Sequence, residues 1–466
     1  MTVLSPQIDT LKRLQTHEIT GTVVAVKGLG LHIADLPLPV GALVRLESKS
    51  YARNNLSHAL RGEVVGFEGS KSIVMLFGSS DGVSPGMYVR GEQAAQTVAV
   101  SESLLGRVIN GLGRPIDGKR IPSDCVGRLL DPPPTCALAR TPITQPLPTG
   151  LRAVDSMLTV GKGQRVGIFS GPGVGKSTLL AMIARNSSAD VNVLALVGER
   201  GREVREFIEK SLGSEGLAKS VIIVATGDES PLLRVRAAMV ACSVAEYFRD
   251  GGADVLLMMD SITRLAQAQR QVGLTVGEQP ATKGYTPSVF AMLPKLLERA
   301  GTIESGGSIT GFYAVLVEGD DLTEPISDAA RGVLDGHIVL SRRLAGRGHY
   351  PAIDLLDSIS RVADTVCDKN HNTARQLVMK LQAAYAEAEE LINIGAYAHG
   401  SNPDCDVAIA LKPKIDQMLR QQVDEVADYP QSCKRLIELA ASAQVEYERQ
   451  AAAKQGGQTA APIATK

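Results

Sequence analysis

The sequence predicts an α/β protein with a parallel sheet at its centre, a small β-barrel before it and a helical region after it. Three observations support this prediction. Short runs rich in Val, Ile and Phe alternate with glycine-rich turns over residues 18–99. Nearly continuous apolar runs alternate with helical segments from 151 to 364, and helical spacing dominates after 367. With 466 residues, the chain is long enough for about three domains.

The first region, residues 18–99, has the pattern of a small closed barrel. Its strand-like stretches include ITGTVVAVKGLGLHIADL and LRGEVVGFEGSKSIVMLF, and glycines mark the turns. Residues 1–17 precede the barrel, with apolar positions near helical spacing. That spacing is compatible with a segment that binds a partner or lies on a membrane, and equally with a terminal helix packed on its own domain.

Residues 100–366 form the predicted α/β domain. It includes a proline-rich linker, DPPPTCALARTPITQPLPTG. The later runs RVGIFS, VNVLALVG, VIIVAT and DVLLMMD are apolar nearly throughout, as expected for parallel strands covered on both faces. Residues 367–450 are predicted to be a helical domain, and the low-complexity stretch 451–466 a disordered tail.

Composition narrows the class of function. The 49 Lys and Arg nearly cancel the 50 Asp and Glu, so the chain lacks the bulk positive charge typical of nucleic-acid binding. Six scattered cysteines without a C-x-x-C pair argue against a metal or disulfide framework and favour a reducing compartment. The N-terminus lacks the apolar core of a secretory signal, and no 18-residue apolar run occurs. We therefore expect a soluble, cytoplasmic protein.

The stretch GIFSGPGVGKSTLL, which begins at Gly167, has the pattern of a phosphate-binding loop between a strand and a helix. Lys176 would supply positive charge to the β- and γ-phosphates, and Ser177 a hydroxyl to Mg²⁺. Ser170 stands where the pattern has its first glycine and is small enough to replace it. Pro172 removes one N–H from the loop. The predicted nucleotide-binding residues of the loop are Gly171, Pro172, Gly173, Val174, Gly175, Lys176, Ser177 and Thr178.

Two carboxylates follow predicted strands of the same sheet. Asp260 closes DVLLMMD and is the expected second Mg²⁺ ligand beside Ser177. Glu199 ends VNVLALVGER, where a carboxylate could activate the water that attacks the nucleotide. Glu199 could equally be a helix-terminal glutamate in the charged run ERGREVREF, and spacing alone does not decide between these roles.

Several ordered motifs together resemble one known family. They are LLGRVINGLGRPIDG, PLPTGLRAVDSMLTVGKGQRVGIFSGPGVGKSTLL, VGERGREVREF, LLMMDSITRLAQAQRQV, GYTPSVFAMLPKLLERAG and EGDDLTEPISDAARGVLDGHIVLSRRLAGRGHYPAIDLLDSISR. The chain resembles the hexameric ATPases of type III protein export, which are related to the catalytic β subunits of rotary ATP synthases. The resemblance is collinear and covers residues 18–440.

This resemblance implies a RecA-like core, a six-stranded barrel, a C-terminal helical domain, and ATP and Mg²⁺ as ligands. Glu199 resembles the catalytic glutamate, and Arg264 an arginine near the γ-phosphate. Arg361, in DSISR, resembles an arginine finger that reaches the neighbouring subunit, although from the residues alone it could be a surface residue. Tyr350, in GHYPAID, resembles the residue that stacks on adenine; the alternative is a packed turn tyrosine.

The same resemblance implies that ATP hydrolysis in a homohexameric ring releases export substrates from chaperones and promotes their unfolding and export. The implied partners are a coiled-coil stalk protein, a regulator or stator-like protein, export-gate membrane proteins and substrate–chaperone complexes, with no nucleic acid. The protein would lie at the inner face of the cytoplasmic membrane. We favour a flagellar system because flagella are common, and a virulence injectisome is the alternative.

Three other functions are alternatives to protein export. A non-catalytic subunit of a rotary ATP synthase would lack the glutamate of VGER, and the acidic C-terminal motif of a catalytic subunit is absent. A ring RNA translocase should carry a basic barrel with stacking aromatics. Residues 20–95 contain four aromatics, three of them at strand-like core positions: Tyr51, Phe67, Phe77 and Tyr88. A nucleotide-binding scaffold without turnover is the third alternative.

Overall fold

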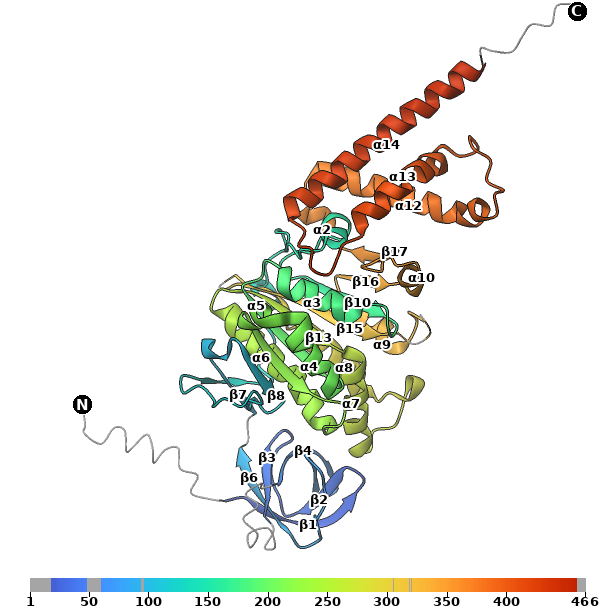
Figure 1. The fold of residues 1–466 in the computed structure, drawn as a ribbon. Coiled ribbons are helices and arrows are strands. Elements are labelled where there is room, and N and C mark those ends of the chain that lie inside the picture. Colours follow the sequence, from blue (N-terminus) through green and yellow to red (C-terminus); the bar gives the residue numbers. More distant parts are fainter. Residues whose placement is uncertain are drawn as a thin grey trace, which may run out of the picture.

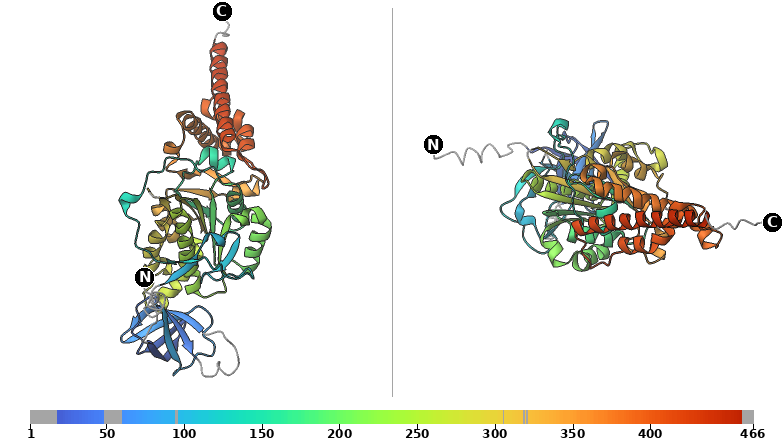
Figure 2. Two further views of the ribbon diagram at one scale, coloured as in Figure 1. Left: turned by 90° about the vertical axis from the view of Figure 1, so that its left-hand side faces the viewer. Right: turned by 90° about the horizontal axis from the view of Figure 1, so that it is seen from above.

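The computed structural model has the three predicted parts along one elongated molecule (Figure 1). It describes residues 18–47, 60–93, 96–304, 306–317, 319 and 321–458. The N-terminal segment 1–17, Tyr51 and residues 459–466 lie outside the described residues. The barrel is at one end, the α/β domain in the middle and the helical domain at the other end (Figure 2).

Six strands close the N-terminal barrel in the order β1-β2-β5-β4-β3-β6, which confirms the prediction. They are β1 (Thr20–Lys27), β2 (Gly30–Ala34), β3 (Leu43–Glu47), β4 (Leu60–Glu68), β5 (Lys71–Leu76) and β6 (Tyr88–Gln93). The next strand, β7 (Thr97–Val100), pairs with β9 (Val126–Leu129) outside the barrel.

The barrel aromatics correct one expectation from the sequence. Phe67 and Tyr88 are 51% and 54% exposed, so neither is a core residue. The strand pairing of β4 shifts register between Val64 and Gly66, and such a bulge changes which side chains face inward. The neighbours of Tyr88 in the chain, Met87 and Val89, are buried. Since successive side chains of a strand point to opposite faces, Tyr88 points outward. Phe77 is partly buried at the junction with the α/β domain.

The central sheet has the strand order β17-β16-β10-β15-β13-β11-β12-β8. All neighbours on this path are parallel except β17, which runs antiparallel to β16, and the short β14 (Gly301–Thr302) pairs antiparallel with β15. The bounds are β8 (Arg107–Asn110), β10 (Arg165–Ser170), β11 (Val191–Val197), β12 (Ser220–Ala225), β13 (Asp254–Asp260), β15 (Ser308–Leu316), β16 (Gly336–Leu340) and β17 (Ile353–Ser360).

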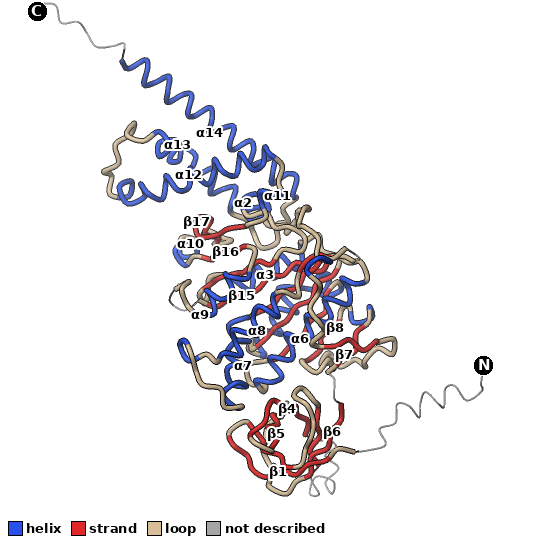
Figure 3. Tube along the Cα trace, turned by 180° about the vertical axis from the view of Figure 1, so that it is seen from behind, coloured by secondary structure: helices blue, strands red, loops and turns tan. Residues whose placement is uncertain are grey.

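Helices cover both faces of this sheet, which explains the continuous apolar runs of its strands. Along β11, Leu194 and Leu196 enter one core with helix α3, whereas Val193 and Ala195 enter the other with α6, α7 and α8 (Figure 3). The helices are α2 (Arg152–Met157), α3 (Lys176–Asn186), α4 (Gly201–Glu206), a π-helical segment (Phe207–Leu212), α5 (Gly213–Ala218), α6 (Pro231–Asp250), α7 (Ile262–Thr275), α8 (Pro287–Leu297), α9 (Pro325–Val333), α10 (Arg342–Gly346) and α11 (Ala363–Val366), with short 3₁₀ turns at Glu102–Leu104, Ala137–Ala139 and Thr282–Gly284.

The C-terminal domain consists of α12 (Lys369–Asn393), α13 (Pro403–Leu419) and α14 (Tyr429–Gln458). Helix α14 projects from the end of the molecule and continues through 458 (Figures 1 and 2). The prediction of a disordered tail from 451 is therefore wrong for residues 451–458. The run Ala451–Ala453 extends the helix because alanine has the highest helix propensity. Within the described part of the chain, no helix has the length and apolarity needed to span a membrane.

Candidate nucleotide-binding site

The phosphate-binding loop lies between β10 and α3, as predicted, at the carboxyl end of the parallel strands. Gly175 precedes the first residue of α3 and has φ of 95°, in the left-handed region that favours glycine. The helix therefore begins directly at Lys176, so its free N–H groups and partial positive charge face the space above the loop. This is the geometry that binds phosphate groups.

The loop side chains take different positions. Gly171 is buried, and Val174 is 2% exposed with its side chain in the core, so Val174 can reach a ligand only through its backbone. Pro172, Gly173, Ser177 and Thr178 are exposed. The core contact of Val174 anchors the loop and leaves its polar atoms at the surface.

Two carboxylates meet the loop lysine beside this loop. The Lys176 ammonium forms an ion pair with Asp260 and lies 3.8 Å from the Glu199 carboxylate. Asp260 ends β13 and Glu199 follows β11, and these strands are neighbours with Leu196 opposite Asp260. The three predicted residues therefore converge because the sheet brings the carboxyl ends of these strands together. All three side chains are largely buried.

Arg264 lies on the first turn of α7, close to the same carboxylate. Its Nη2 is 3.6 Å from Oε2 of Glu199, and its Nη1 donates to the carbonyl oxygen of Gly198. A Cβ added to Gly198 would lie 2.9 Å from the Arg264 side chain, so this close approach requires glycine. Arg264 thus holds both the backbone before Glu199 and its carboxylate.

The environment of Glu199 raises its pKa to about 7. Burial is the largest cause and the negative charge of Asp260 is the next, while Lys176 and Arg264 oppose the rise. Its Oε1 atom is buried and has no hydrogen-bond partner. A buried acceptor without a partner is rare in proteins and indicates a place for water or a ligand. A carboxyl group with this pKa can exchange a proton near neutral pH.

A cavity of about 300 Å³ opens beside these groups, lined by Ser177, Thr178, Glu199 and Asp260. Further lining residues include Glu203 and Phe207, which the sequence analysis did not identify. Glu203 is on the first turn of α4, whereas Glu199 precedes that helix, so helical spacing along the sequence could not have identified it. A hydroxyl and several carboxylates are the hard oxygen donors that Mg²⁺ prefers, so these residues fit the predicted metal.

Tyr350 and Arg361 occupy different places relative to the loop. The ring of Tyr350 would lie 3.7 Å from a Cβ added to Gly175, and the side chain is 46% exposed. Arg361 follows β17, whose last residue pairs with Gly336 at the start of β16. It is therefore at the opposite end of the sheet, ~13 Å or more along the strands from its own loop. Arg361 is exposed, and its backbone N–H donates to the carbonyl oxygen of Asp335.

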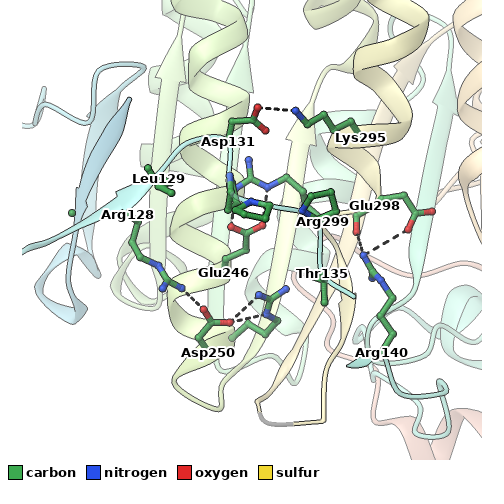
Figure 4. Close-up of a pocket in the computed structure, with 15 residues that line it drawn as sticks. Arg128, Leu129, Asp131, Thr135, Arg140, Glu246, Asp250, Lys295, Glu298 and Arg299 are labelled. Carbon is green, nitrogen blue, oxygen red and sulfur yellow. Dashed lines mark hydrogen bonds and ion pairs between the residues drawn. The ribbon is translucent and has the colours of Figure 1, made fainter. Parts of the chain in front are cut away.

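A second cavity, of about 420 Å³, is lined by residues 131–135 of the proline-rich linker and by residues of α6 and α8 (Figure 4). Its charged side chains form ion pairs with one another. Arg299 makes two hydrogen bonds of 2.7 Å to Glu246, and Lys295 lies 2.7 Å from Asp131. Arg128 pairs with Asp250 in the same way. We regard this cavity as a site where ion pairs hold the linker to α6 and α8.

The loop, the lysine and the two carboxylates at strand ends define a protein that binds and hydrolyses nucleoside triphosphates. Comparison with known proteins agrees with this class. Residues 150–360 match the model of the ATP synthase alpha/beta family, nucleotide-binding domain. Residues 17–92 match that family's beta-barrel domain, and residues 367–438 match the T3SS EscN ATPase C-terminal domain.

The chain belongs to the family of type III protein-export ATPases. It is 47% identical over 432 residues to the Flagellum-specific ATP synthase of Bacillus subtilis, an alignment that covers 93% of this chain and 98% of the relative. It is 53% identical over 364 residues to the SPI-2 type 3 secretion system ATPase of Salmonella typhimurium, covering 78% and 84% of the two chains.

A solved structure supports the fold along nearly the whole chain. The assembled ATPase EscN of the enteropathogenic E. coli type III secretion system is 41% identical, with a TM-score of 0.83, covering 90% of this chain and all of EscN. EscN has also been solved in complex with its central stalk EscO. The chain is thus an ATPase with the predicted RecA-like core, barrel and helical domain.

Proposed function

We propose that this protein hydrolyses ATP in a homohexameric ring to drive flagellar protein export. One observation carries the catalytic part of this proposal. The Glu199 carboxylate, with its pKa raised to about 7, lies beside Lys176, Asp260 and the phosphate-binding loop. A base poised near neutral pH next to a phosphate-binding loop is suited to activating water.

In this mechanism the loop amides and Lys176 bind the β- and γ-phosphates. Lys176 must leave its ion pair with Asp260 to do so, which frees that carboxylate. Ser177 and Asp260 would then hold Mg²⁺, which neutralises charge on the phosphates. Glu199 accepts a proton from water while the water oxygen attacks the γ-phosphorus. The bond between the γ-phosphorus and the β–γ bridging oxygen breaks, and that oxygen leaves with ADP. Arg264 keeps the Glu199 carboxylate oriented throughout.

Two further residues would complete the site. The exposed ring of Tyr350 beside Gly175 offers a surface on which adenine can stack. Arg361 is too far along the sheet to serve its own loop, and it is exposed. In a ring it would act on the neighbouring subunit, where its charge stabilises the transition state. Hydrolysis would then depend on assembly.

The flagellar assignment rests on relatives named as flagellum-specific ATP synthases, which align over most of the chain. An injectisome is the second candidate because relatives from type III secretion systems align as well. In either system, the ring would lie in the cytoplasm at the inner membrane face. We expect a coiled-coil stalk protein, a regulator or stator-like protein, export-gate membrane proteins and substrate–chaperone complexes as its partners.

A chromosomal Lys176→Ala substitution tests the assignment. We expect cells that still contain the protein to lose flagellar filaments, which are counted per cell. Normal filaments together with loss of secreted effectors would instead support the injectisome. Normal filaments and normal secretion would contradict a role in export.

A further inference from the structure

The connection between β16 and β17, residues 341–352, carries α10 and, near its end, Tyr350. Its two ends are joined by a hydrogen bond of 2.8 Å from the Ser341 N–H to the Ala352 carbonyl oxygen. Because β16 and β10 are parallel neighbours, the connection leaves the sheet at the same edge as the phosphate-binding loop. This is why the Tyr350 ring lies beside Gly175.

Helix α10 and Arg347, the residue after it, are held by one carboxylate of the helical domain. Nη1 of Arg343 lies 2.7 Å from one oxygen of Glu389, and Nη1 of Arg347 lies 2.6 Å from the other. Glu389 is on α12, and its side chain is only 13% exposed. The hydrogen bond from Arg347 lowers the pKa of Glu389, so the carboxylate is charged at neutral pH.

None of the five residues of α10 is fully buried, although Ala345 packs against the neighbouring hydrophobic core. A cavity of about 70 Å³ separates α10 from α12 and α13. The far end of the connection is also attached to the helical domain. The Gln421 N–H, just after α13, donates to the carbonyl oxygen of Tyr350 at 3.0 Å. The connection that carries Tyr350 is therefore attached to the helical domain at two points, and Tyr350 itself makes one of them.

We propose that Glu389 is a positioning residue for the nucleotide: by clamping Arg343 and Arg347, it sets the place of Tyr350 and thereby the affinity for ATP and ADP. The inference rests on the proposed function, in which Tyr350 contacts adenine. Within the described residues, the ion pairs of Glu389 are with Arg343 and Arg347, which lie outside the phosphate-binding loop. A shift of α12 relative to the sheet moves α10 and Tyr350 with it.

Glu389→Gln tests this proposal in the full-length protein, with Glu390→Gln as a matched control. Glu390 is the next residue on α12 and is exposed, so the control removes the same charge without breaking the clamp. Both changes are made with Tyr350 present and in a Tyr350→Ala background. The dissociation constant for ADP is measured by calorimetry, and KM and kcat for ATP by phosphate release. The double variant Arg343→Gln/Arg347→Gln removes the same ion pairs from the other side.

We expect Glu389→Gln to weaken ADP binding and raise KM about fivefold, the order expected for two partly exposed ion pairs, with kcat changed less than twofold. The arginine double variant should give the same result. In the Tyr350→Ala background, Glu389→Gln should have no further effect, because the two residues act through one path. Unchanged affinity in Glu389→Gln, or an equal loss with and without Tyr350, would overturn the proposal. A wild-type protein that binds no ADP would instead refute the proposed function.

Discussion

The pH dependence of ATP hydrolysis follows directly from the environment of Glu199. Its pKa of about 7 means that the carboxylate is the minor form at pH 6 and the major form at pH 8. If Glu199 accepts the proton of water, kcat/KM should therefore rise about tenfold between these values. A glutamate with the ordinary pKa of 4.5 would be almost fully ionised over the same range, and the rate would change by only a few per cent.

The direction in which Arg264→Gln shifts the pH profile of kcat/KM also follows from this environment. Arg264 is one of the positive groups that hold the pKa of Glu199 down. Its replacement in Arg264→Gln should move the acid limb of kcat/KM to higher pH, besides lowering the rate. A shift of the acid limb to lower pH would show that Arg264 does not act on this carboxylate.

The assay is phosphate release at low ATP and saturating Mg²⁺ from pH 5.5 to 9, because kcat/KM reports groups of the free enzyme. Residual hydrolysis by Glu199→Gln serves as the control, since protonation of ATP itself affects both proteins equally. A wild-type rate that is flat between pH 6 and 8, or an identical acid limb in Glu199→Gln, would refute the reasoning.

Three further predictions concern the ring, the metal and stability. Arg361→Ala should hydrolyse ATP at least ~100-fold more slowly. It should regain part of its rate when mixed with Glu199→Gln subunits, because these supply Arg361 to a neighbour with an intact Glu199. No recovery in mixed rings would contradict action on a neighbour. Chelation of Mg²⁺ should abolish hydrolysis while nucleotide remains bound through the loop, which phosphate release and equilibrium dialysis distinguish. Arg152→Ala should lower the free energy of unfolding, measured by urea titration, by about 2–4 kcal/mol. The reason is that this buried guanidinium donates to the Met418 and Arg420 carbonyls and pairs with Glu425. A loss smaller than the error of the titration would contradict this prediction.

The sequence predicted the local parts of this molecule well. Continuous apolar runs identify buried parallel strands, and the order strand, glycine-rich turn, helix locates Lys176 and Ser177. Contacts between segments far apart in the sequence could not be predicted in this way. The proposed role of Glu199 depends on β11 lying next to β13, and no spacing along the chain contains that information. The clamp at Glu389 likewise joins α10 to a helix far along the chain and could not be predicted.

The predictions for Phe67 and for residues 451–458 were wrong because each relied on one local sequence pattern. The alternation along β4 is interrupted by a bulge, so Phe67 faces outward although the pattern placed it in the core. The low complexity of residues 451–458 suggested disorder, but an alanine-rich sequence can continue a helix that has already formed. Arg361 could be recognised only from the family resemblance, because nothing in its local sequence distinguishes it from a surface arginine.

The central claim is that the Glu199 carboxylate activates water for ATP hydrolysis, and the most direct test compares purified wild-type protein with Glu199→Gln at pH 8. We expect Glu199→Gln to bind ADP with wild-type affinity and to release phosphate ~10²–10⁴-fold more slowly. Hydrolysis by Glu199→Gln at a rate within twofold of the wild type would contradict the claim.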